Sequence, residues 1–154
     1  MKDETYYEQR AEQIFCEGYN CAQAVFITFA EEQMSREKAA QLASAMGGGL
    51  AGMRMVCGAV SGMAMAYGML RGYSNPQAKD EKKAEYAAVR EMADEFVRLN
   101  GSVICRELLG LDETAKRSPS EQGAEHPVKR PCSQLCGCAA KILAHYIETH
   151  PLAE

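Results

Sequence analysis

The sequence lacks a long hydrophobic run, an excess of positive charge and a secretory signal. Its longest nearly apolar stretch, residues 56–70, lies between Arg54 and Arg71 and is shorter than the roughly 18 residues that suggest a membrane span. We therefore expect a buried helix there and a chain that does not span a membrane. The net charge of -4 opposes binding to phosphates, so nucleic acid is excluded as a predicted partner. Residues 1–13 are polar and acidic, which predicts a cytoplasmic protein.

Compact C-x-x-C pairs, which are typical of zinc ribbons and thioredoxin-like sites, are also absent, although the chain has 7 cysteines. Clustered thiols in a reducing compartment more often serve metals or redox chemistry than structural disulfides. A single cysteine can equally be a small buried hydrophobic residue. The positions of the cysteines must therefore decide between these interpretations.

Hydrophobic residues recur along the chain with helical spacing, and 154 residues suit one domain, predicted over residues 1–154. The predicted fold class is all-α, a compact bundle of about six or seven helices with a long polar loop, residues 112–131, before the last helix. This loop is a candidate lid. A strand over residues 56–66 is the less favoured alternative. The predicted helices cover residues 3–16, a segment after the Asn20 cap, residues 35–46, a segment after Cys57, residues 75–100 with Asn75-Pro76 as the start, residues 102–109, and a segment from Cys132 to Pro151.

Four of the cysteines, Cys21, Cys57, Cys105 and Cys132, fall in the first turn of a predicted helix. A helix N-terminus carries partial positive charge and unpaired N–H groups, which should lower the pKa of a thiol there. Thiolate is both the nucleophile in disulfide exchange and the ligand for zinc or iron–sulfur clusters. We therefore predict that these four side chains converge on one cavity, with four separate core residues as the competing interpretation. The glycine-rich residues 47–52 lack the ending of a phosphate-binding loop and predict flexibility or a close backbone approach to this site.

The same cysteines carry a resemblance to a known family. Four segments support it: GYNCAQAV at residues 18–25, CGAVSG at 57–62, CRELLG at 105–110, and PCSQL at 131–135 followed by Ala139 and Ala140. Over nearly its whole length the chain resembles the C-GCAxxG-C-C family, proposed redox-active proteins with four characteristic cysteines. The resemblance implies a helical redox protein, and a similar module in split-Soret cytochromes implies an iron–sulfur or other metal centre. Family members are often associated with transporter genes, which implies a transporter-associated partner.

The chain departs from the family pattern by three additional cysteines, Cys16, Cys136 and Cys138. Cys136 stands where the pattern has an apolar residue. Because Cys132 and Cys136 are four residues apart, they are neighbours on one helix face. Cys136 is therefore a candidate substitute metal ligand or a resolving thiol.

The leading functional prediction is electron or thiol–disulfide transfer by Cys21, Cys57, Cys105 and Cys132. These residues either bind an iron–sulfur cluster or another metal ion, or, with no cofactor, are redox-active thiols that form reversible disulfides. The metal is slightly favoured because four cysteines complete the coordination of a cluster. One alternative is a non-enzymatic metal-binding or structural module held together by zinc or copper, and another is a cysteine-rich adaptor. The redox partner is unknown, and the apolar helical surface predicts a homodimer.

Overall fold

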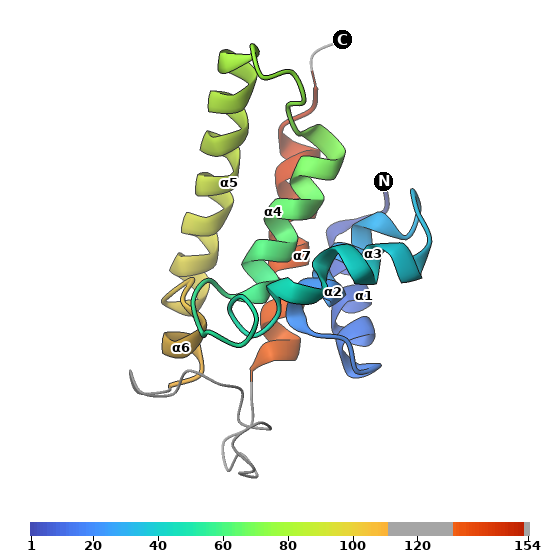
Figure 1. The fold of residues 1–154 in the computed structure, drawn as a ribbon, viewed down its shortest axis with the longest axis vertical. Helices are drawn as coiled ribbons and strands as arrows, with labels where there is room; N and C mark the ends of the chain where they lie inside the picture. Colours follow the sequence, from blue (N-terminus) through green and yellow to red (C-terminus); the bar gives the residue numbers. More distant parts are fainter. Residues whose placement is uncertain (111–130, 153–154) are drawn as a thin grey trace.

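The computed structural model describes residues 1–110 and 131–152 as a bundle of α-helices (Figure 1). The prediction of a compact all-α bundle is confirmed, since the described residues contain seven α-helices, one short 3-10 helix and only an isolated β-bridge, between Val56 and Ile104. The proposed lid, residues 112–131, lies outside the described residues except for its last position. The helices are α1 (Glu4–Cys16), α2 (Cys21–Ala30), α3 (Arg36–Ala43), the 3-10 helix η1 (Ser44–Met46), α4 (Gly58–Arg71), α5 (Lys79–Asn100), α6 (Cys105–Leu108) and α7 (Cys132–Thr149).

Short-range capping explains why the first helices begin where the sequence predicts. The Asn20 side chain accepts a hydrogen bond from the Gln23 N–H, and the Gln23 side chain accepts one from the Asn20 N–H, which together form a capping box at α2. Ser35 caps α3 by accepting from the Lys38 N–H. Each of these hydrogen bonds joins residues three positions apart, so the sequence alone can predict them.

Two predicted helix starts are wrong for a common reason. The Asn75 side chain accepts from the Gln77 N–H at 2.9 Å, and α5 begins only at Lys79. The Ser102 hydroxyl likewise accepts from the Ile104 N–H at 2.9 Å, and α6 begins only at Cys105. Asn and Ser side chains that bond to the backbone two residues ahead form a local turn, which competes with helix capping.

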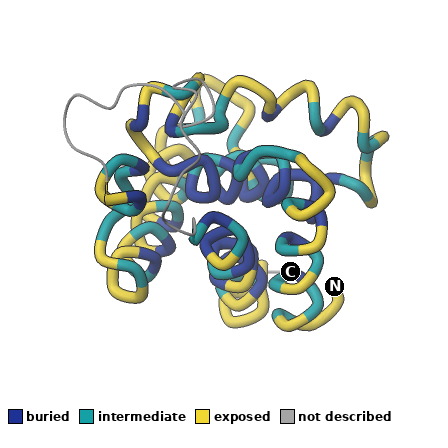
Figure 2. The backbone as a smooth tube through the Cα atoms, turned by 90° about the horizontal axis from the view of Figure 1, so that it is seen from below, coloured by how far each residue is buried: buried dark blue, intermediate teal, exposed yellow. Residues whose placement is uncertain are grey.

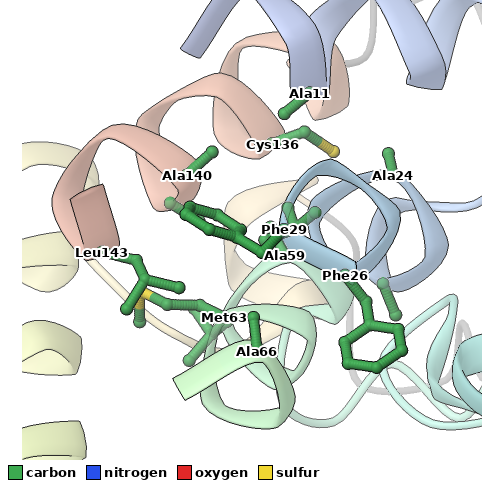
Figure 3. Close-up of a cluster of buried hydrophobic side chains, with 14 of the residues drawn as sticks. Ala11, Ala24, Phe26, Phe29, Ala59, Met63, Ala66, Cys136, Ala140 and Leu143 are labelled. Carbon is green, nitrogen blue, oxygen red and sulfur yellow. The ribbon is translucent and has the colours of Figure 1, made fainter. Parts of the chain in front are cut away.

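Helix α2 forms the centre of the bundle, in contact with α1, α3, α4 and α7. Eight of its ten residues are buried, and in Figure 2 the buried stretches gather along the inner helices while exposed residues cover the outside. Figure 3 shows Phe29 from α2 among Met63 of α4 and Leu143 of α7, all in one hydrophobic cluster. This packing joins α2, α4 and α7 in one hydrophobic core.

The longest helix, α5, packs on this core along one face only. Its buried residues are Ala88, Met92 and Phe96, spaced at helical intervals, and its charged N-terminal turns are exposed. It contacts α4 and α7. Within the described residues, no helix combines the length and apolar character that crossing a bilayer requires.

Candidate functional site

The four predicted site cysteines all stand at helix starts. Cys21, Cys105 and Cys132 are the first residues of α2, α6 and α7, and Cys57 is the N-cap of α4. The sequence prediction of their local positions is therefore confirmed. The first N–H groups of a helix have no partner inside their own helix, and those of Ala59 and Val60 hydrogen-bond with the Cys57 sulfur.

These cysteines line a single cavity of about 370 Å³. Four segments that are far apart in the sequence meet there, and none of the seven cysteines, which all belong to the described residues, is in a disulfide. The structure thus brings together the four thiols for which the sequence predicted convergence. The cavity wall is completed by the Arg54 side chain and by apolar or aromatic groups from Phe15, Tyr19, Leu108, Leu109 and Leu135.

Backbone hydrogen bonds hold Cys57 and Cys105 as neighbours. The Cys57 N–H donates to the Val103 carbonyl at 2.7 Å, and the Cys105 N–H donates to the Met55 carbonyl at 2.6 Å. These bonds flank the antiparallel bridge that joins the two segments. The pair is therefore fixed by main-chain geometry rather than by side-chain packing alone.

Two glycines let the helix starts come close enough for the sulfurs to share the cavity. A Cβ atom at Gly58 would lie 3.2 Å from the Cys21 Cβ and 3.0 Å from the Ala22 nitrogen. A Cβ atom at Gly47 would lie 2.4 Å from the Asn20 side chain, which caps α2. The interpretation of residues 47–52 as a close backbone approach to the cysteine site agrees with this contact.

Arg54, which follows the same glycine-rich segment, is a buried cation that sequence reasoning missed. Residues 48–52 all have positive φ angles, and so has Arg54 at +63°. Left-handed geometry costs a non-glycine residue roughly 1–2 kcal/mol, and such strain persists only where the surrounding structure enforces it. Arg54 is 3% exposed, and its guanidinium donates a hydrogen bond to the Cys105 sulfur at 3.5 Å. The sequence offered only a weak signal, an arginine just after a glycine-rich run.

The prediction that helix N-termini lower the thiol pKa is wrong for Cys21 and Cys57. Burial raises the pKa of Cys57 to about 12, although the N–H groups of Ala59 and Val60 act in the opposite direction. A hydrogen bond with Cys132 lowers the pKa of Cys21, but the bond with Cys136, burial and neighbouring thiols raise it well above its usual value. Both thiols therefore keep their protons at neutral pH in the metal-free protein and are poor nucleophiles.

The three additional cysteines lie outside the cavity wall. Cys136 is fully buried, and its thiol donates to the Cys21 carbonyl at 3.8 Å. Figure 3 shows Cys136 in the hydrophobic cluster with Ala11 and Ala24. Cys138 is half-buried and accepts a hydrogen bond from the Asn100 amide at 3.4 Å. Cys16 is exposed at the end of α1. Cys136 is thus hydrogen-bonded to the backbone of a site cysteine.

The four cysteine sulfurs are the groups at this cavity that could hold a metal or cofactor. Within residues 1–110 and 131–152, no three side chains of Cys, His, Asp or Glu are arranged to hold one metal ion. The cavity of about 370 Å³ equals the volume of about a dozen water molecules at roughly 30 Å³ each. Four sulfurs around such a space match the number of thiolates that an iron–sulfur cluster needs.

Comparison with known proteins gives a family match that covers this site. A family model described as "putative redox-active protein (C_GCAxxG_C_C)" matches residues 19–146. No match was found among the curated proteins or among the solved structures. The matched residues include all four cysteines of the cavity and most of the chain, so the chain belongs to the C-GCAxxG-C-C family.

Proposed function

We propose that this protein transfers electrons through one centre built on Cys21, Cys57, Cys105 and Cys132. The observation that carries the proposal is the single cavity that all four thiols line. Four cysteines scattered through a core as hydrophobic residues would have no reason to share a cavity. The family's redox character agrees with this use of the site.

We favour a role as ligands of an iron–sulfur cluster. Three of the thiols are at most 9% exposed, which suits ligands better than thiols that a partner must attack directly. The cluster would supply one-electron chemistry, with Cys21, Cys57, Cys105 and Cys132 as its ligands. The apolar walls from Phe15 and Leu135 would limit the access of water to these sulfurs.

A reversible disulfide between Cys21 and Cys132 is the second candidate. The hydrogen bond between their side chains favours it, since hydrogen-bonded thiols need little movement to form a bond. In that reaction an S–S bond replaces two S–H bonds, and two protons and two electrons pass to a disulfide or peroxide acceptor. The Cys57 and Cys105 pair, held by the backbone, offers a second disulfide of the same kind.

Anaerobic purification with iron and acid-labile sulfide analysis, and absorbance spectra before and after dithionite, tests the cluster directly. We expect iron, sulfide and a visible band that dithionite bleaches. Serine substitutions at each of the four cavity cysteines should abolish the band. Cys138→Ser is the matched control on α7, because Cys138 does not line the cavity, and it should keep the band.

Other outcomes separate the alternatives. A colourless, metal-free protein whose peroxide-treated form contains a Cys21–Cys132 linkage by mass spectrometry would establish the disulfide candidate instead. Zinc or copper alone, with loss of structure on chelation and no redox transition, would establish the structural module. Cys136→Ala tests whether this thiol is a substitute ligand, because loss of bound metal would then follow its removal. A wild-type protein that contains neither bound metal nor a disulfide linkage would refute the proposed function.

The cytoplasmic location, the transporter-associated redox partner and the homodimer stay predictions from the sequence and the family resemblance. Size-exclusion chromatography with light scattering tests the homodimer. Capture experiments on the anaerobically purified protein test the partner.

A further inference from the structure

The proposed function uses four sulfurs but gives no role to the buried guanidinium among them. Within the described residues, Arg54 is the only charged side chain that is buried. It lines the cavity and donates to the Cys105 sulfur at 3.5 Å. Removing a charge from water is costly unless an interaction compensates it. The contact with the Cys105 sulfur joins the Arg54 guanidinium to the four-cysteine site.

The backbone holds Arg54 and Cys105 in a fixed relation. The Arg54 N–H donates to the Gly48 carbonyl at 2.9 Å, and the Arg54 carbonyl accepts from the Arg106 N–H at 3.3 Å. The adjacent Met55 carbonyl accepts from the Cys105 N–H. The left-handed segment and the first turn of α6 are thus joined on both sides of the contact.

We propose that Arg54 raises the reduction potential of the four-cysteine site by stabilising negative charge on the Cys105 sulfur. This inference rests on the proposed function. An electron that enters a thiolate-bound cluster makes its sulfurs more negative, and hydrogen bonds to those sulfurs favour the reduced state. A disulfide that includes Cys105 takes up two electrons as its S–S bond breaks, and each sulfur then carries a proton or a negative charge. Because a guanidinium stabilises the charged sulfur, the sign of the effect is the same for both chemistries.

The test is a redox titration of the anaerobically purified wild-type protein and of Arg54→Gln, Arg54→Lys and Arg71→Met. If the protein is coloured, mediator dyes set the potential of the solution. If it is metal-free, mixtures of reduced and oxidised dithiothreitol set that potential. Arg54→Gln should shift the equilibrium at least tenfold toward the oxidised form, which is about 30 mV for a two-electron couple and about 59 mV for one electron. Arg54→Lys keeps the charge and should stay within about threefold of the wild type.

Arg71→Met is the control for a lost arginine far from the cavity, because Arg71 ends α4 and contacts the end of α7. Its potential should equal that of the wild type. Circular dichroism verifies that each variant is folded. An unchanged potential in Arg54→Gln would overturn the inference. A shift of tenfold or more in Arg54→Lys would also overturn it, and this outcome decides the question if Arg54→Gln does not fold. A wild-type protein with no redox transition would instead refute the proposed function itself.

Discussion

The Cys57 thiol is subject to two opposing effects, and burial is the stronger. The free N–H groups at the start of α4 favour a thiolate, but Cys57 is only 3% exposed, and its pKa rises to about 12. Neighbouring cysteines add to the effect because two negative sulfurs would repel each other. A helix terminus activates a cysteine only where water or a cation also reaches the sulfur. In this cavity a metal, or oxidation to a disulfide, would have to remove the proton.

This raised pKa predicts that the metal-free protein loses stability in alkaline solution. The folded pKa of about 12 lies above the unfolded value of about 8.5, so the folded state holds the proton more tightly. The contribution is complete below pH ~8.5 and is lost as the pH rises toward 12. Between pH 8 and pH 10, Cys57 should lower the free energy of unfolding by about 2 kcal/mol. Urea unfolding under reducing, anaerobic conditions, followed by circular dichroism, measures this loss.

Cys57→Ala provides the control for the pH effect. The variant is expected to be less stable at every pH because it leaves a small cavity, but its loss between pH 8 and pH 10 should be smaller by about 2 kcal/mol. Other groups that titrate near pH 10 are common to both proteins. Equal losses in the two proteins would show that the Cys57 proton does not contribute.

Local sequence signals were enough to predict that the site cysteines lie at helix starts. They were not enough to predict that Arg54 is buried at the site. Cys21 follows a capping residue whose bonds reach only Gln23, so its place at a helix start can be inferred from the sequence. The left-handed geometry at Arg54 depends on bonds to Gly48 and Arg106, and the latter is far away in the sequence. A charged residue beside an apolar run normally marks a solvent-exposed end. Its burial could not be predicted without the tertiary contacts.

At the level of helices, the close packing of α2 and α4 depends on small residues at their interface. A Cβ atom at Gly62 would lie 2.6 Å from the Ala22 carbonyl oxygen and 3.2 Å from the Val25 side chain. Glycines in the apolar stretch indicated a tightly surrounded helix, and α4 agrees with that expectation. The sequence could not predict which of these glycines pack against α2, because the contact depends on the angle between the two helices.

Two alanine substitutions in α4 should therefore have opposite effects on stability. Gly62→Ala forces a methyl group against the backbone of α2, and overpacking of this kind costs about 1–3 kcal/mol, more than the helix propensity of about 1 kcal/mol that alanine adds. Gly68→Ala meets nothing closer than a Glu85 oxygen at 4.0 Å and should stabilise the helix by about 0.5–1 kcal/mol. Urea unfolding at pH 7 measures both. Stabilisation of the protein by both substitutions would contradict the close contact.

In the molecule as a whole, the candidate site is continuous with the main hydrophobic core. Phe15 and Cys21 pack against the main cluster and also against the small cluster of Cys105, Leu109 and Cys132. The main cluster includes residues from α1, α2, α3, α4, α5 and α7. A partner that changes the charge of the sulfurs would therefore act on a region that is joined to the packing of the whole bundle.

This continuity predicts that the chain is one cooperative unit, as the sequence suggested for residues 1–154. Phe96 of α5 and Ile14 of α1 both belong to the main cluster and are fully buried, so loss of either helix would expose the same core. We expect one unfolding transition in urea, with the same midpoint from far-ultraviolet circular dichroism and from tyrosine fluorescence. Phe96→Ala should lower that midpoint for both signals together, by a destabilisation of about 3–5 kcal/mol. Separate midpoints, or a shift confined to one signal, would mean that α5 unfolds independently of the helices that carry the cysteines.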